Sequence, residues 1–219
     1  MPRRARNFQR AICYHLMNRG VNRLPIFKDD QDREYFSRLV LYYKEICGAH
    51  VYHWVWMHNH YHMLTSVTYD NLRAFTGGIQ QCFAQYHHAR HKTCGVFWQG
   101  RFKSKPVEIG AYLAVCGRYI ERNPVRKGLV LQAWDYQWSS AAAYVKQAAD
   151  GITDLNPYLG DFTPRDRRNY RKLLMLDETD RDIRAYEHSG VIGAPDFAKT
   201  LILSRGHYRI KRGRPAKIV

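Results

Sequence analysis

The chain has 219 residues, of which 45% are hydrophobic and 25% charged, a composition typical of one globular domain with room for a small appendage. Its 35 Lys and Arg residues against 19 Asp and Glu residues give a formal net charge of +16, which favours a polyanionic partner, either nucleic acid or an anionic membrane surface. The sequence has no apolar run near the length of about 18 residues that a membrane span needs, no secretory signal and no disulfide-like spacing among its five cysteines, so we expect a cytoplasmic protein.

The spacing of apolar residues predicts alternating strands and helices. Asn18-Arg19-Gly20 is expected to break the first strand. Asp29 and Asp30 suit the cap of the first helix, and Pro124 is expected to stop the last one. In chain order, the predicted elements are a strand at 11–17, a helix at 30–46, strands at 51–57 and 60–67, a helix at 71–91, a short strand at 101–107 and a helix at 109–123.

This order predicts an α+β fold with an antiparallel sheet, close to the split β-α-β arrangement of ferredoxin-like folds, with helices on one or both faces. We expect residues 1–150 to form the catalytic domain, residues 151–204 a small, mostly helical region, and residues 205–219 a basic tail. In the tail, the run from Arg212 through Gly213 and Arg214 to Pro215 resembles the core of an AT-hook. A basic tail that binds phosphates without specificity is the alternative.

His60 and His62 lie on either side of Tyr61 in the predicted strand 60–67. Alternate residues of a strand share a face, so the two imidazoles project together and Tyr61 points into the opposite layer. Two neutral imidazoles at this spacing can share one divalent metal ion. A hydrogen-bonded or solvent-facing pair is the alternative for so short a pattern, and the nearby His53 and His58 could compete as ligands.

Tyr119 and Asn123 are one turn apart on the predicted helix 109–123. Alone, Tyr119 suits a packing residue beside the apolar stripe, and Asn123 a helix-end residue. With the histidines, Tyr119 could instead attack a phosphodiester while a metal ion on His60, His62 and Asn123 stabilises the developing charge. Such a mixed imidazole and amide site suits Mg²⁺ or Mn²⁺. The stripe expected to face the sheet consists of Ile109, Leu113, Cys116 and Ile120, and Tyr112 is expected on the face of Tyr119.

Cations and aromatic residues near these motifs could hold the nucleic acid. Cations contact phosphates, and aromatic rings stack on unpaired bases. A solvated loop with one buried aromatic anchor is the alternative. The candidate phosphate contacts are Arg19, Arg23, Arg101, Lys103 and Lys105, with Arg212 and Arg214 in the tail, and the candidate stacking residues are Trp98, Phe97 and Phe102.

The ordered motifs resemble those of the IS200-type HUH tyrosine transposases, and more closely those of the REP-associated tyrosine transposases of bacteria. The resemblance covers most of residues 10–145. It rests on Tyr14-His15-Leu16, Asn18 to Arg23, Ile26-Phe27, Met57 to Leu64, Trp98 to Ser104, Tyr119 to Val130, and Trp138-Ser139-Ser140. The family commonly has proline where this chain has His58, which adds a possible ligand in the turn.

The resemblance implies that His60 and His62 bind the metal ion, that Asn123 completes the site and that Tyr119 is the nucleophile. It also implies cleavage and rejoining of single-stranded DNA with REP-type hairpins through a 5′-phosphotyrosine, without a nucleotide cofactor. A catalytically silent regulator that binds hairpin DNA or RNA is the alternative, and a membrane-surface protein is disfavoured because no Lys-rich amphipathic helix is evident. We expect a monomer, with a dimer as the alternative.

Overall fold

The computed structural model describes residues 13–177 and 190–197. The predicted basic tail, with Arg212 and Arg214, lies outside these residues, as do the first two residues of the predicted strand 11–17. In the described part, no helix is both long enough and apolar enough to cross a membrane.

A four-stranded antiparallel sheet forms the centre of the molecule, in the order β2-β3-β1-β4. The chain reaches this order by a strand, a helix and a hairpin, followed by a second helix and the fourth strand. This is the split β-α-β arrangement, so the predicted α+β ferredoxin-like fold is confirmed. The strands are β1 (Cys13–Arg19), β2 (His50–Met57), β3 (His60–Ser66) and β4 (Lys103–Val107).

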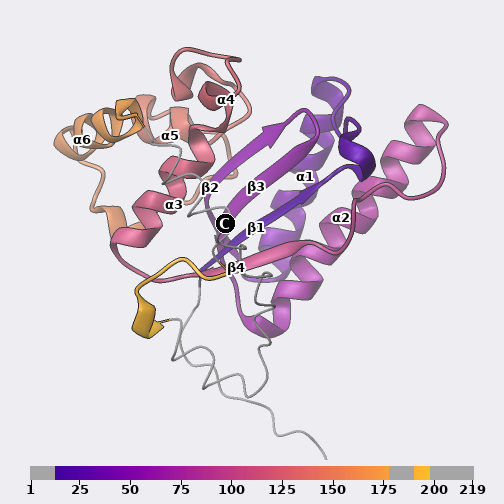
Figure 1. The fold of residues 1–219 in the computed structure, drawn as a ribbon, viewed down its shortest axis with the longest axis horizontal. Coiled ribbons are helices and arrows are strands. Elements are labelled where there is room, and N and C mark those ends of the chain that lie inside the picture. The colour runs from indigo at the N-terminus through magenta and orange to yellow at the C-terminus, as the bar shows by residue number, and fades with distance from the viewer. Residues whose placement is uncertain (1–12, 178–189, 198–219) are drawn as a thin grey trace, which may run out of the picture.

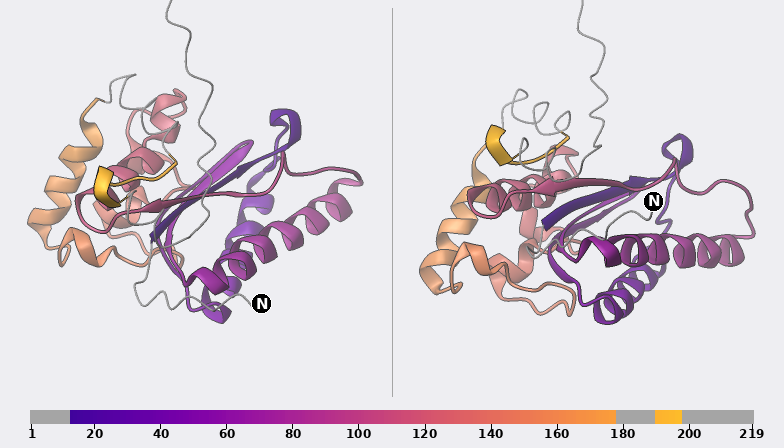
Figure 2. Two further views of the ribbon diagram at one scale, coloured as in Figure 1. Left: turned by 60° about the horizontal axis from the view of Figure 1, so that its bottom comes forward. Right: turned by 90° about the horizontal axis from the view of Figure 1, so that it is seen from below.

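Helices lie on both faces of the sheet (Figure 1; Figure 2). Helices α1 (Asp30–Ile46) and α2 (Tyr69–His91) cover one face, where Phe36 and Phe83 pack with Tyr61 in the larger apolar core. Helix α3 (Ala111–Glu121) lies on the other face, where Ile120 packs with Leu64. Because α3 packs mainly against β2 and β3, part of this second face stays open.

Two predicted boundaries are wrong. Strand β1 continues through Asn18 and Arg19, because β3 pairs with both residues, and the break comes only at Gly20. Pro124 does not stop the helical path: α3 ends at Glu121, and Pro124 lies in the first turn of the short helix α4 (Asn123–Arg126), where a missing backbone N–H costs no hydrogen bond.

The predicted apolar stripe of the last helix is confirmed for three of its four members. Leu113, Cys116 and Ile120 are fully buried against the sheet, but Ile109 is 41% exposed. Ile109 precedes the helix, because Gly110 has a φ of 120° and separates it from the first turn. The predicted cap at the start of α1 is confirmed, since the side chain of Asp29 accepts a hydrogen bond from the backbone N–H of Asp32.

The remaining described segments cover the edges of the sheet. Ser140 hydrogen-bonds Trp54 on the outer edge of β2, and Ile192 pairs with Val107 on the outer edge of β4. Covered edges cannot pair with another chain. The other helices are α5 (Ala141–Lys146), α6 (Pro164–Met175) and three 3-10 turns, Val21–Arg23, Ala133–Asp135 and Pro157–Leu159. Helix α6 lies in the predicted helical region 151–204, whose separation from the main domain stays a prediction.

Candidate functional site

A cleft of 630 Å³ opens on the face of the sheet that α3 leaves uncovered. The predicted nucleophile and all three predicted metal ligands line it. It is lined by His15, Met17, Arg19, Arg23, Asn59, His60, His62, Lys103, Lys105, Tyr119, Asn123 and Lys127.

The strand register explains why these side chains meet. Met17 on the central strand β1 pairs with His62 on one side and with Lys103 on the other. Alternate residues on all three strands therefore point into the cleft. The residues between them point to the α1 and α2 side, where Tyr61 is fully buried and accepts a hydrogen bond of 2.5 Å from Gln80. The predicted opposite orientation of Tyr61 is confirmed.

The Nδ1 atoms of His60 and His62 each have a partner. His62 Nδ1 lies 2.8 Å from His15 Nε2, and His60 Nδ1 lies 2.7 Å from Asn59 Oδ1. Such contacts leave the Nε2 atoms as the candidate metal-binding nitrogens and hold the rings in place. The two rings are perpendicular, with centroids 5.1 Å apart.

The two competing histidines do not line the cleft. His53 is fully buried behind α3, where its Nδ1 contacts Glu121, and His58 is exposed in the turn between β2 and β3. Of the four candidate histidines in the hairpin of β2 and β3, His60 and His62 line the cleft, and His53 and His58 do not.

The imidazoles of the cleft are held in the neutral form. Burial, together with the charges of Arg19 and Lys127, lowers the pKa of His60 to about 4, and Asn123 opposes part of this shift. Burial also lowers the pKa of His62 and of His15 well below the usual value. A neutral imidazole is the form that binds a metal ion.

Tyr119 is positioned by rings and a cation. Its ring lies edge-on to His62 and His15, with centroids 6.0 Å and 5.9 Å away. The guanidinium of Arg126 lies 4.3 Å from the centroid of the Tyr119 ring, and the same group donates a hydrogen bond to the Tyr119 carbonyl. Tyr119 is 7% exposed, so the ring is packed more tightly than the predicted position beside the core stripe suggested. Tyr112 packs on the same core without lining the cleft.

Asn123 is the first residue of α4, just after the end of α3, and it lines the cleft. Its Nδ2 donates to the carbonyls of Tyr119 and Ile120 at 3.1 Å and 3.0 Å. These hydrogen bonds cap the last turn of α3, which agrees with the interpretation of Asn123 as a helix-end residue, and they leave Oδ1 as a candidate metal-binding atom. Asn123 and His60 line the same cleft.

A buried network fixes α3, and therefore Tyr119, on the sheet. The carboxylate of Glu121 contacts His53 Nδ1 at 2.8 Å and accepts hydrogen bonds from Ser140 at 2.6 Å and Tyr170 at 2.9 Å. Gly117 allows the close approach, because a Cβ at this position would lie 2.6 Å from the His53 ring. Helices α3, α5 and α6 are thus tied to β2 at one point.

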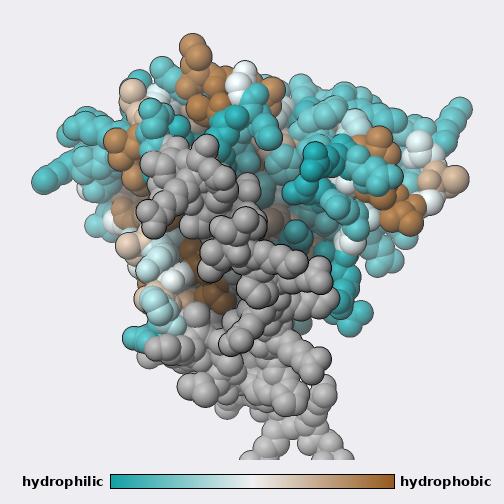
Figure 3. Space-filling model, in the orientation of Figure 1, coloured by the Kyte–Doolittle hydropathy of each residue, from teal (hydrophilic) through white to brown (hydrophobic). Residues whose placement is uncertain are grey.

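The cleft is strongly basic. Four of the predicted phosphate-binding cations, Arg19, Arg23, Lys103 and Lys105, line it together with Lys127, and no Asp or Glu is among its described lining residues. Figure 3 shows hydrophilic residues on this side of the molecule, with several hydrophobic patches between them. Five cations in one cleft provide a surface for a polyanion.

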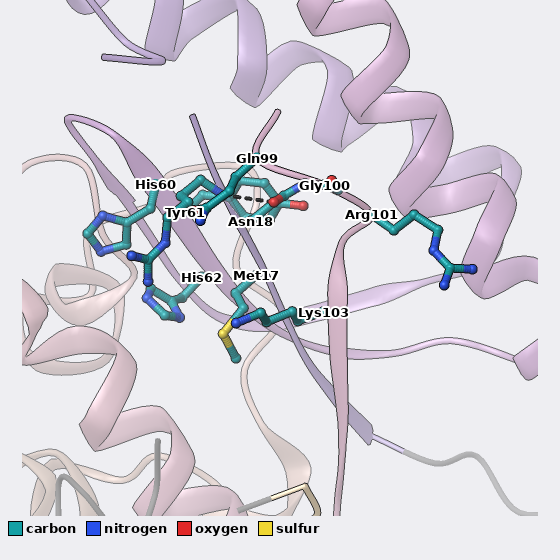
Figure 4. Close-up of a pocket in the computed structure, with 10 residues that line it drawn as sticks. Met17, Asn18, His60, Tyr61, His62, Gln99, Gly100, Arg101 and Lys103 are labelled. Atoms are coloured by element: carbon teal, nitrogen blue, oxygen red, sulfur yellow. Dashed lines mark hydrogen bonds between the residues drawn. The ribbon is translucent and has the colours of Figure 1, made fainter. Parts of the chain in front are cut away.

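A second cavity of 330 Å³ adjoins the cleft and shares five lining residues with it: Met17, Arg19, His60, His62 and Lys103. It extends toward Gly100 and the neighbouring Gln99 and Arg101. In Figure 4, the imidazoles of the two histidines lie at one side of this cavity, and the side chain of Arg101 points away from them. Arg101 is therefore placed farther from the histidines than Lys103.

The predicted stacking residue Trp98 is partly buried. Its indole N–H donates to the carbonyl of Gln80 at 2.9 Å, and its ring packs against Tyr61 and Phe83 in the larger core. Phe97 and Phe102 pack against the same core. The structure therefore favours the buried-anchor alternative for this loop, and base stacking by Trp98 stays a prediction.

Three residues of the site escaped the sequence-based assignment of roles. These are His15, which contacts His62, and the cations Arg126 and Lys127 next to Tyr119 and in the cleft. The signal for His15 was available: in a ferredoxin-like sheet the first and third strands are neighbours, so alternate residues of β1 must share a face with His60 and His62.

The family model of the IS200-like transposases matches residues 8–123, and the chain belongs to this family. Among solved structures, a REP-associated tyrosine transposase bound to a REP hairpin is similar, with a TM-score of 0.54 and 19% sequence identity over 74% of this chain and 94% of that chain. A candidate transposase from Deinococcus radiodurans R1 has a TM-score of 0.38 and 13% identity over 58% of this chain and 98% of that chain. No curated protein matches the sequence. The first similarity shows a shared fold, and the family establishes a transposase class.

Proposed function

We propose that this chain is a metal-dependent enzyme that cleaves and rejoins single-stranded DNA bearing REP-type hairpins, with Tyr119 as the nucleophile. The observation that carries this proposal is that Tyr119, His60, His62 and Asn123, from one strand and two consecutive helices, line one basic cleft. Membership of the IS200-like family and the fold shared with a hairpin-bound REP-associated transposase support it.

The donors in the cleft fit a small divalent cation. His60 and His62 are neutral and present Nε2, because Nδ1 of each has a partner, and Asn123 presents an amide oxygen. This set, with water and a phosphate oxygen, suits Mg²⁺ or Mn²⁺. When bound, the ion would polarise the scissile phosphate and stabilise its developing negative charge.

The chain's own residues supply the nucleophile and hold the DNA. The Tyr119 oxygen forms a bond to phosphorus while the bond to the 3′ oxygen breaks. The phenol proton is lost to solvent, and the 3′ oxygen leaves and takes up a proton. The product is a 5′-phosphotyrosine and a free 3′-hydroxyl. Attack of a 3′-hydroxyl on the phosphotyrosine reverses the step, so rejoining requires no nucleotide cofactor.

The cations of the cleft would bind the strand that Tyr119 attacks. Arg19, Arg23, Lys103 and Lys105 approach the same space as Tyr119, which suits contacts to phosphates on both sides of the cleavage point. Arg101 and Trp98 on the adjoining loop would extend this surface, and Arg212 and Arg214 of the tail would add contacts to the hairpin. We propose that a monomer, with its catalytic machinery in residues 1–150, is sufficient.

Incubation of the protein with a labelled single-stranded hairpin and Mg²⁺ or Mn²⁺ tests this function. We expect a covalent adduct that resists denaturation, its loss in Tyr119→Phe and with chelator, and its retention in the control Tyr112→Phe. His60→Ala should abolish cleavage while DNA binding persists. Hairpin binding without an adduct, with either metal ion, would contradict the enzyme and favour a catalytically silent regulator.

A further inference from the structure

A second group of metal-binding side chains lies between α1 and α2, on the opposite face of the sheet from the cleft. Asp32 is in the first turn of α1, and His87 and His91 are one turn apart near the end of α2. One ligand atom from each residue lies within 4.8 Å of the other two. His91 Nε2 already lies 3.1 Å and 3.0 Å from the two carboxylate oxygens of Asp32.

The ion pair of Asp32 with His91 leaves His87 unexplained. His87 is only 4% exposed, and neither of its ring nitrogens has a hydrogen-bond partner. A buried imidazole without a partner is costly. Its ring centroid is 4.3 Å from that of His91, so it sits against the same group. Burial lowers the pKa of His87 to about 4, which keeps the ring in its metal-binding form.

The charges around the group balance. Arg90 forms two hydrogen bonds with Asp29, at 2.8 Å and 2.7 Å, and one with Asp32 Oδ1 at 2.5 Å. The two carboxylates of Asp29 and Asp32 are matched by the guanidinium of Arg90 and by Lys28, whose positive charge acts on His87. Asp32 Oδ2 accepts a hydrogen bond of 2.8 Å from the Lys28 backbone and faces His91 Nε2 at 3.0 Å, so a metal ion bound to Oδ2 and Nε2 would replace the direct contact of Asp32 with His91.

We propose that Asp32, His87 and His91 bind a transition-metal ion of the Zn²⁺ type at a site separate from the DNA cleft. Two imidazole nitrogens and one carboxylate oxygen are a common zinc ligand set, and a water molecule can take the fourth position. That position would face the side of His91, whose side chain is 14% exposed. The metal ion supplies the partner that His87 otherwise lacks.

The site would stabilise the loop that borders the smaller cavity. The His87 ring packs on Phe97, with centroids 4.6 Å apart. The Phe97 carbonyl accepts a hydrogen bond from Val21, and the Gln99 backbone donates one to Arg19, which lines both cavities. An ion at His87 would therefore tie α1 and α2 to the base of this loop. The inference does not depend on the proposed cleavage activity.

Zinc binding to the full chain, stripped of metal, tests the site. A variant with His60→Gln and His62→Gln removes the imidazoles of the cleft, and calorimetric titration with Zn²⁺ should still show one equivalent bound. In that background, His87→Gln and His91→Gln, each made singly, should weaken Zn²⁺ binding at least about 100-fold. His88→Gln is the matched control, because His88 is on the same helix but contacts Thr93.

Thermal unfolding gives a second readout. At about 100-fold excess over Kd, Zn²⁺ should raise Tm by roughly 5–10 °C only when Asp32, His87 and His91 are all present.

Two results would overturn the proposal. One is the loss of all Zn²⁺ binding with the cleft histidines, which would leave a single metal site in the cleft. The other is undiminished binding in His91→Gln, a change at the exposed side of the group that decides the matter even if the buried His87→Gln fails to fold. Retention of binding in the His88→Gln control with loss in His91→Gln would support the site.

Discussion

The ring of Tyr119 stands edge-on to the imidazole of His62, with centroids 6.0 Å apart and an angle of 85° between the planes. Tyr119 comes from α3 and His62 from β3, so neither element alone creates the pair. Two contacts maintain the relative position of the two rings. His15 contacts His62 and orients its ring, and Glu121 fixes the helix that carries Tyr119. Each contact leads to a prediction.

His15→Ala should lower the affinity of the cleft for the metal ion without lowering its affinity for DNA. The change removes the partner of His62 Nδ1, and loss of such a supporting contact typically costs about 10–100-fold in metal affinity or activity. The Mn²⁺ concentration needed for half-maximal cleavage should rise, and hairpin affinity without metal should stay the same.

His15→Gln serves as the control for that change, because an amide can restore a hydrogen bond to His62. We expect partial recovery of cleavage at low Mn²⁺. If both variants lose thermal stability equally while their Mn²⁺ dependence matches that of the unchanged protein, His15 is a packing residue and does not orient His62.

Glu121→Ala should destabilise the fold by about 3–5 kcal/mol, because it leaves buried donors of a hydrogen-bonded network without their acceptor. The carboxylate is fully buried and contacts His53, Ser140 and Tyr170. Urea denaturation measures the change. Glu45→Ala on the exposed side of α1 is the control and should lie within about 0.5 kcal/mol of the unchanged protein. Equal denaturation midpoints for the two variants would rule out a stabilising role for the network.

Lys103→Ala combined with Lys105→Ala should reduce the salt dependence of single-stranded DNA binding. Both lysines line the cleft, and each phosphate contact contributes about 0.7 to the slope of log K against log salt for single strands. The slope should therefore become shallower by about 0.7 for each lysine that contacts a phosphate. Lys146→Ala is the control, because Lys146 on α5 lies outside the cleft and pairs with Asp135. A slope that changes as little in the double variant as in this control would exclude the cleft as the path of the strand.

Local patterns were sufficient to predict most of the fold. The order of elements and the opposite directions of Tyr61 and His62 follow from periodicity, and the cap at Asp29 follows from its hydrogen-bonding side chain. The end of β1 was missed because Asn18 and Arg19 are turn-forming in isolation, and only pairing with β3 keeps them extended. Pro124 was misjudged because its effect depends on whether it ends one helix or begins the next.

The candidate site was predictable in part. His60, His62, Tyr119 and Asn123 belong to short motifs, and the structure brings them into one cleft. Long-range packing decides the other roles: the contact of His15 with His62 depends on strand register. The unpartnered ring of His87 depends on how α2 packs against α1, which spacing along one helix cannot reveal.

The most direct test of the central claim is to locate the covalent bond. After reaction with a hairpin and Mn²⁺, the protein would be digested with nuclease and protease, and mass spectrometry would identify the peptide that carries a nucleotide remnant. We expect the remnant on Tyr119, in the peptide from α3. A remnant on Tyr112 or on any other residue, with Tyr119 unmodified, would contradict it.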